Sequence, residues 1–143
     1  MRGSKAMILP DKIKVMFEVV PVMALATVDG KGMPNVVAVA SKRLVDDDTI
    51  WLIDAYFGKT LENVKLNGNV ALSMWIPPEG YQIKGVGYYH TDGVVYDFGK
   101  EWVTDLWIKK GKKVKEVKGV IEVKISEAYS ISANYQEAGL RLL

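Results

Sequence analysis

The sequence predicts a mainly β protein, a small β-barrel with peripheral helices. Short apolar runs follow one another along the 143 residues, and turns rich in Gly, Pro and Asp separate them. Ile121, Val123 and Ile125 alternate with charged residues, which is typical of a strand with one buried face. Helical spacing is confined to short segments. The length fits one domain, which we place at residues 7–143, and residues 1–6 have the composition of an expression leader.

The first third of the chain predicts a helix and a hairpin. Residues 11–20 carry apolar side chains every three or four positions, as one face of a helix does. The runs 22–27 and 34–42 flank Asp29-Gly30, a pair that favours a hairpin turn. The run 36–40 does not alternate, so we expect both of its faces to be covered.

The rest of the chain predicts further strands and two more helices. A short helix is expected over 61–66 and a longer one after Gly93, and Gly85 marks a bulge or a close approach of backbones. The residues expected on one face of the longer helix are Phe98, Trp102, Leu106 and Trp107. The remaining strand-like runs are 49–53, 70–76, 81–90 and 121–125. With the hairpin, these make six or seven strands, which favours a small barrel.

Composition excludes several kinds of site. The chain has no cysteine and a single histidine, His90, which excludes disulfides, thiolate metal sites, cysteine nucleophiles and multi-histidine metal sites. The net charge of +2 does not indicate a dedicated nucleic-acid or membrane-surface protein. The longest apolar stretch, 19–28, is far shorter than the roughly 20 residues of a spanning helix, so we expect a cytoplasmic protein.

Gly58-Lys59-Thr60 is the most informative local motif. It stands where a strand meets a predicted helix, and a helix N-terminus offers unpaired N–H groups and a partial positive charge. With an ammonium and a hydroxyl group beside them, such N–H groups can hold a phosphate. The motif is not a P-loop, because Ile53 stands where a P-loop has glycine. The alternative is that Thr60 only caps the helix and Lys59 is a solvated surface residue.

Other clusters have simpler interpretations. Six lysines follow the longer helix and could bind polyphosphate or nucleic acid, but a solvated helix C-terminus is the interpretation we favour. They are Lys109, Lys110, Lys112, Lys113, Lys115 and Lys118. Asp46-Asp47-Asp48 lacks the alternating spacing of a calcium loop and predicts a solvated turn. The four tryptophans are expected in the core, although one of them could flank a flat ligand.

In order and spacing, several segments between residues 9 and 131 resemble the FMN-binding split-barrel family related to pyridoxamine 5′-phosphate oxidase. The resemblance extends to one of its members, the small FMN-binding protein of sulfate-reducing bacteria. The segments are Leu9-Pro10, Ala24-Leu25-Ala26-Thr27, Lys59-Thr60 with Glu62-Asn63-Val64, Gly85, and Thr91-Asp92-Gly93. The resemblance implies a six-stranded Greek-key split barrel that forms a homodimer, with FMN between the protomers.

The resemblance also implies which residues bind the cofactor. One strand would run along the flavin, the bend after the next strand would surround it, and the Lys-Thr pair would hold its phosphate, with a second lysine nearby. These residues are Val37, Ala38, Val39, Lys42, Asp54, Ala55, Tyr56, Phe57, Lys59 and Thr60. We expect Lys42 and Asp54 to tune the redox potential of the flavin, and His90 to be structural rather than catalytic.

Some residues depart from the family pattern. Val37 stands where relatives have Asn or Arg. The C-terminal Arg-and-His region of the oxidase has no counterpart in this chain, so we do not expect it to oxidise pyridoxamine 5′-phosphate. The tail 132–143 extends past the small protein and could cover the flavin or the dimer seam. Three functions stay open: an FMN-dependent reductase or electron carrier, a flavin- or ligand-binding module without turnover, and, least favoured, a small nucleic-acid-binding barrel.

Overall fold

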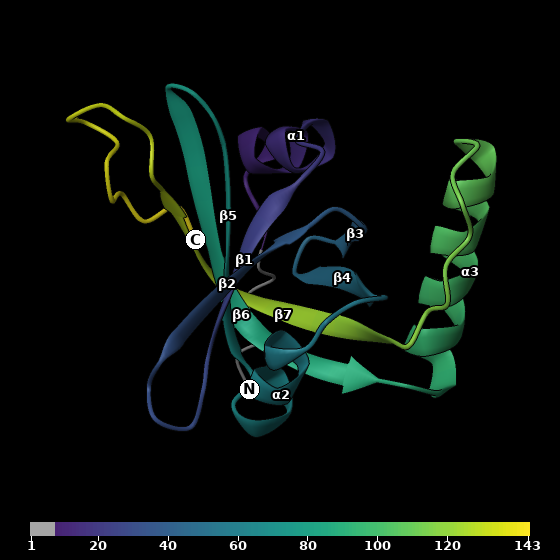
Figure 1. Cartoon of the computed structure of the whole chain (residues 1–143). Helices are drawn as coiled ribbons and strands as arrows, with labels where there is room; N and C mark the ends of the chain where they lie inside the picture. The colour runs from purple at the N-terminus through teal and green to yellow at the C-terminus, as the bar shows by residue number, and fades with distance from the viewer. Residues whose placement is uncertain (1–7) are drawn as a thin grey trace, which may run out of the picture.

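The computed structural model describes residues 8–143, so the leader predicted at residues 1–6 lies outside the described residues. Helices are interspersed among the more numerous strands along the chain, as Figure 1 shows. Their bounds are α1 (Asp11–Val19), β1 (Met23–Val28), β2 (Pro34–Val39), β3 (Lys42–Asp46), β4 (Thr49–Asp54), α2 (Lys59–Leu66), β5 (Asn69–Ile76), β6 (Glu79–His90), α3 (Gly93–Lys109) and β7 (Gly119–Ser130). The mainly β architecture with peripheral helices is therefore confirmed.

All the strands of residues 8–143 belong to one antiparallel sheet of seven, in the order β2-β1-β5-β6-β7-β4-β3. The resemblance implied six strands. The count differs because the run 34–42 breaks after Val39, and Lys42 begins a separate strand that pairs with β4. The two edge strands, β2 and β3, are thus joined by only two residues. Such a short link brings the two edges close together, so the sheet must curl.

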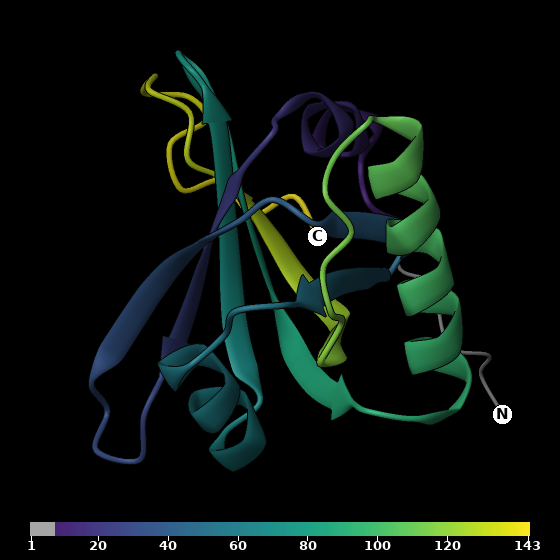
Figure 2. The same ribbon diagram turned by 45° about the vertical axis from the view of Figure 1, so that its right-hand side comes forward.

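The curled sheet encloses the main core (Figures 1 and 2). No ladder joins β2 to β3 within the described chain, so closure of the barrel by hydrogen bonds is not seen. The helix α1 lies at one end of the curl and buries Ile13, Met16 and Phe17, the face that its apolar spacing predicts. β2 differs from expectation, because Val36 and Ala38 are exposed in the single chain rather than covered.

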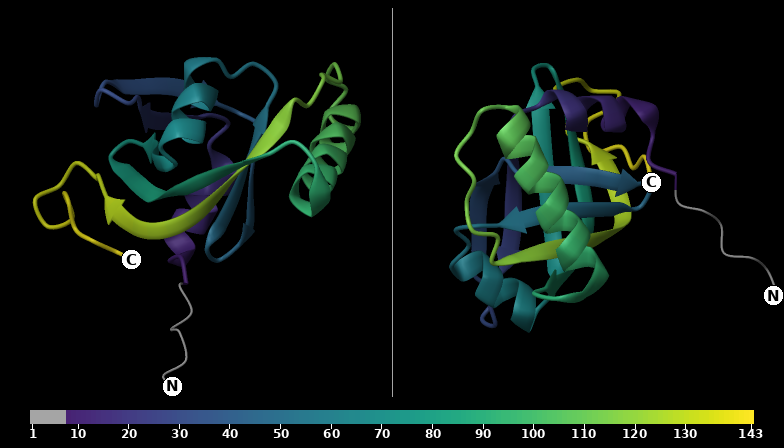
Figure 3. Two further views of the ribbon diagram at one scale, coloured as in Figure 1. Left: turned by 90° about the horizontal axis from the view of Figure 1, so that it is seen from below. Right: turned by 90° about the vertical axis from the view of Figure 1, so that its right-hand side faces the viewer.

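Outside the curl, α3 packs across β4 and β7 and forms a second core (Figure 3, right). Val103 and Trp107 face this core, whereas Phe98, predicted on the same face, is 59% exposed. Gly99 allows the helix to approach closely, because a Cβ atom there would lie 2.8 Å from a methyl group of Val120.

Two further features concern β6, β7 and the tail. The register of the β6–β7 pair shifts between Lys84 and Gly85, which confirms the predicted bulge, and a Cβ at Gly85 would lie 2.3 Å from a carbonyl oxygen. The tail folds back on β7, where the Leu142 amide donates to the Ala128 carbonyl at 2.7 Å. No helix within residues 8–143 is long and apolar enough to cross a membrane.

Candidate functional site

A pocket of about 390 Å³ opens between β2, the bend that joins β4 to α2, and the C-terminal part of α3. We call it the β2–α2 pocket. All but two of the residues predicted to bind a cofactor line it, although they come from separate parts of the sequence. They are Val37, Ala38, Val39, Ala55, Tyr56, Phe57, Lys59 and Thr60. The structure therefore brings the predicted strand, bend and helix start together around one cavity.

Asp54, one of the two exceptions, lies behind the wall of the pocket and is fully buried. Its carboxylate accepts a hydrogen bond from the Phe57 amide at 2.8 Å and another from the Tyr89 hydroxyl at 2.6 Å. Burial, and then the hydrogen bond to Asp54, raise the pKa of Tyr89 well above its ordinary value. Asp54 thus holds the shape of the bend 54–57, and its side chain does not line the pocket.

Lys42, the other exception, is directed toward α1. Its ammonium donates to the carbonyl of Phe17 at 2.8 Å and lies 4.5 Å from the centre of the Phe17 ring. Partial burial lowers the pKa of Lys42. Because a carbonyl in the last turn of a helix lacks an intrahelical donor, this lysine supports the end of α1. Among the described residues, neither Lys42 nor Asp54 has its side chain at the pocket where it was expected to tune a flavin.

The start of α2, which lines the pocket, carries unpaired backbone donors. Within the described chain, the amides of Gly58, Lys59 and Thr60 make no hydrogen bond, while the next two amides both donate to the Gly58 carbonyl. The structure places Gly58, not Thr60, at the N-cap, and Thr60 is almost fully buried. The alternative in which Thr60 caps the helix with its side chain is therefore wrong, and the predicted junction of free N–H groups is present.

A small polar network fixes this helix start on the sheet. The Asn35 side-chain amide donates to the hydroxyl oxygens of Thr60 at 3.1 Å and Thr27 at 3.3 Å. The buried Asn63 amide also donates to Thr27, at 3.0 Å. Thr60 accepts from Asn35 and keeps its hydroxyl hydrogen available to donate. Two strands thus set where the first turn of α2 lies.

The pocket lining also includes residues that were not expected there from the sequence, among them Asn35, Trp107 and Lys115. Asn35 is a polar residue in an otherwise apolar strand, and this is the one local signal that could have marked it. Trp107 was assigned to the core, and it does belong to the second core. Lys115 was grouped with solvated lysines, all of which are exposed, and its place at the pocket depends on the path of the chain after α3.

The charged residues of the pocket lining are Lys59 and Lys115, and no carboxylate is among the lining residues within the described chain. Neither lysine makes an ion pair with a described residue. The remaining walls are largely apolar, with Val37, Val39 and Ile53 among them. Such a pocket attracts an anionic ligand that also has an apolar or aromatic part.

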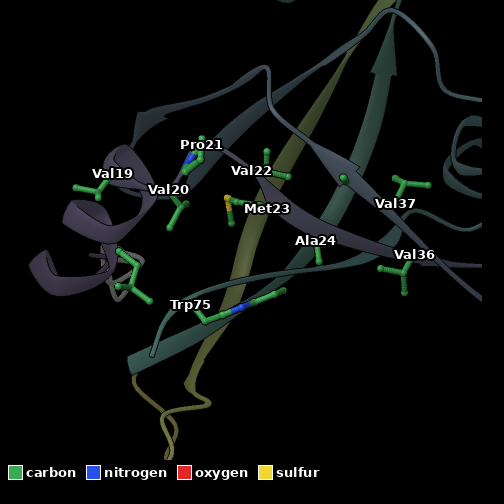
Figure 4. Close-up of a pocket in the computed structure, with 11 residues that line it drawn as sticks. Val19, Val20, Pro21, Val22, Met23, Ala24, Val36, Val37 and Trp75 are labelled. Atoms are coloured by element: carbon green, nitrogen blue, oxygen red, sulfur yellow. The ribbon is translucent and has the colours of Figure 1, made fainter. Parts of the chain in front are cut away.

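A second concavity, of about 580 Å³, lies on the other side of β2 and is almost wholly apolar (Figure 4). We call it the β1–β2 groove. Val22, Val36 and Trp75 line it and are each about half exposed or more. Val37 and Ala38 line both the groove and the β2–α2 pocket, so β2 separates the two.

Other candidate groups lie elsewhere. His90 forms a 3.0 Å contact with Glu122 at the far end of β6 and does not line the pocket, as expected of a structural residue. The Asp46–Asp48 turn contacts Lys14 and Thr49. No cluster of three or more potential metal ligands exists within residues 8–143.

The sequence was compared with models of known protein families. The sequence model of the pyridoxamine 5′-phosphate oxidase family matches residues 9–132. The chain belongs to this family. As a family member it has the split-barrel type of sheet described above, and the family expected from the sequence is confirmed. No curated protein matches the chain.

Several solved structures have the same fold, and the alignments with the three described here each cover more than four fifths of this chain. HupZ of Group A Streptococcus is 25% identical, with a TM-score of 0.76 over 92% of this chain and 100% of that chain. An FMN-binding protein from Syntrophomonas wolfei subsp. wolfei is 18% identical, with a TM-score of 0.71 over 85% and 84%. An F420 reductase is 18% identical, with a TM-score of 0.65 over 84% and 98%. The last two likenesses show the fold alone.

Proposed function

We propose that the β2–α2 pocket binds FMN. The observation that carries this proposal is the lining of the pocket: two unpaired lysines, free amides at the start of α2, apolar walls and no carboxylate among the described lining residues. Lys59 and the amides beside it would hold the phosphate, as helix N-termini hold anions. Val37, Val39 and Phe57 offer apolar contacts to a flat ring. The volume of about 390 Å³ falls within the roughly 300–1,000 Å³ typical of ligand pockets.

The proposed class is an FMN-dependent oxidoreductase, acting as a reductase or an electron carrier. FMN supplies hydride and electron transfer when it is bound. The described lining contains no histidine or carboxylate, and we assign its side chains to binding the cofactor, orienting it and excluding water. Membership of the family does not by itself assign oxidation of pyridoxamine 5′-phosphate, because one fold hosts several activities.

The test is the visible spectrum of the purified protein, followed by titration of the apoprotein with FMN and riboflavin. Flavin absorption and tighter binding of FMN than of riboflavin are expected, because the lysines and amides recognise the phosphate. A colourless protein that binds neither flavin would refute the proposal, and co-purifying nucleic acid would favour the barrel that binds nucleic acid. Stopped-flow mixing with NADH or NADPH then distinguishes a reductase from a binding module.

We also propose a homodimer in which a second copy covers the β1–β2 groove. Val36, in the edge strand β2, is 64% exposed, and Trp75 across the groove is 56% exposed. Apolar side chains gathered in one concavity favour burial by a partner surface. Because β2 also lines the β2–α2 pocket, a copy seated in the groove would lie beside the bound cofactor.

Light scattering of the FMN-loaded protein tests the homodimer, and twice the chain mass is expected. Val36→Asp should yield monomers because it places a charge in the groove. Val94→Asp is the matched control, since Val94 is 70% exposed on α3 and lines neither cavity. A monomeric wild-type holoprotein would contradict the proposal.

A further inference from the structure

The segment 112–118 forms a strap beside the β2–α2 pocket. It runs from the end of α3 back along that helix and leads into β7 (Figure 2). Hydrogen bonds hold both ends: the Lys112 amide donates to the Trp107 carbonyl at 2.8 Å, and the Lys118 amide donates to the Asp54 carbonyl at 2.9 Å. The strap is thereby tied at one end to α3 and at the other to the bend that shapes the pocket.

Lys115, in the middle of this strap, reaches the pocket. Its ammonium lies 5.5 Å from the centre of the Tyr56 ring and 5.7 Å from the centre of the Trp107 ring, and all three residues line the pocket. The faces of aromatic rings attract an ammonium without accepting its N–H groups as a carboxylate would. No described carboxylate forms an ion pair with Lys115. Its N–H groups therefore stay available to an anion.

Lys115 and Lys59 enter the same cavity from different elements. Lys59 belongs to the first turn of α2, where free amides accompany it, whereas Lys115 comes from the strap and is accompanied by two rings. A single phosphate site at the start of α2 does not require a second cation on the strap. The second cation makes the whole pocket electropositive, which raises the affinity for anions and does not help a neutral ligand.

We propose that Lys115 is a specificity-determining residue of the β2–α2 pocket, which selects a phosphorylated ligand over the neutral ligand with the same ring system. This inference rests on the proposed binding of FMN. Tyr56 and Trp107 position the ammonium, and the strap sets its distance from the pocket wall. Lys115→Met tests the charge, because methionine keeps an unbranched apolar side chain at this position.

The experiment titrates apoprotein of the full chain with FMN and with riboflavin, at two salt concentrations. Lys115→Met should bind FMN about tenfold more weakly than the wild type, which corresponds to the lower limit of the free energy of one charge-assisted hydrogen bond. The variant should bind riboflavin as tightly as the wild type does. Its FMN affinity should also fall less steeply with salt. Lys115→Arg should keep the preference for FMN. Lys113→Met, the matched control, removes an exposed strap lysine that does not line this pocket, and it should change neither affinity.

The outcomes separate this inference from the proposed function. If the wild type prefers FMN and Lys115→Met binds FMN equally well, the role of Lys115 is overturned while FMN binding stands. If the variant loses affinity for both flavins equally, Lys115 packs against the rings and does not select charge, which also overturns it. If the wild type binds neither flavin, the proposed function fails and this inference fails with it. If the wild type binds both flavins equally, FMN binding stands and the selective role of Lys115 is overturned.

Discussion

Replacing Asp54 with alanine should both destabilise the protein and deform the β2–α2 pocket. The carboxylate is fully buried and accepts hydrogen bonds from the Phe57 amide at 2.8 Å and the Tyr89 hydroxyl at 2.6 Å. A hydrogen bond to a charged group contributes about 1.5–3 kcal/mol, so two of them give about 3–6 kcal/mol. Because Tyr89 is only partly buried, we expect the lower limit, about 3 kcal/mol.

Urea unfolding followed by tryptophan fluorescence measures this loss. A double-mutant cycle with Tyr89→Phe should give a coupling energy of about 1–2 kcal/mol, since each single change removes the same hydrogen bond. Asp97→Ala is the control, because Asp97 is exposed on α3 and should change stability by less than about 0.5 kcal/mol. An Asp54→Ala variant as stable as this control, or a coupling energy near zero, would refute the account of the bend.

Four further predictions concern other residues. Burial and the hydrogen bond to Asp54 raise the pKa of Tyr89 above its ordinary value of 10.0, so just above that pH Tyr89 ionises in the unfolded state and not in the folded state. The wild type should therefore lose part of its stability advantage over Tyr89→Phe when urea unfolding is measured above pH 10.0. Lys59→Ala should weaken FMN binding by about one to two decades, and Lys112→Ala should not, as flavin titration will show. Lys42→Met should lower the unfolding free energy by about 1 kcal/mol, with FMN affinity and midpoint potential unchanged, because its ammonium binds a carbonyl of α1. His90→Gln should leave the rate of flavin reduction near that of the wild type in stopped-flow measurements, and loss of reduction with FMN still bound would require a proton relay.

Local patterns in the sequence were sufficient for most elements. The spacing over residues 11–20 gave α1, the alternation at Ile121–Ile125 gave part of β7, and Gly85 marked the bulge. These predictions succeeded because each depends on neighbours a few residues away along the chain. The strand count was less secure, since the break between Val39 and Lys42 depends on which strand each half pairs with, and that is a long-range choice.

The candidate site shows the same division. The segments 37–39 and 55–60 could be placed at one cavity from the sequence and its resemblance, because each is a continuous stretch that lines the cavity as a unit. The directions of the Lys42 and Asp54 side chains could not be predicted from the sequence. Their hydrogen-bond partners, the Phe17 carbonyl and the Tyr89 hydroxyl, lie 25 and 35 residues away in the chain.

By itself, then, the sequence determined the mainly β fold class, the family, and the free N–H groups at the start of α2, since these depend on residue type and local order. Only the tertiary structure decided which charges face the pocket. Trp107 and Lys115 line it because Gly99 lets α3 pack closely on β7 and because the strap returns from that helix to the bend at Asp54. Long-range packing of this kind leaves no periodic signal in the sequence.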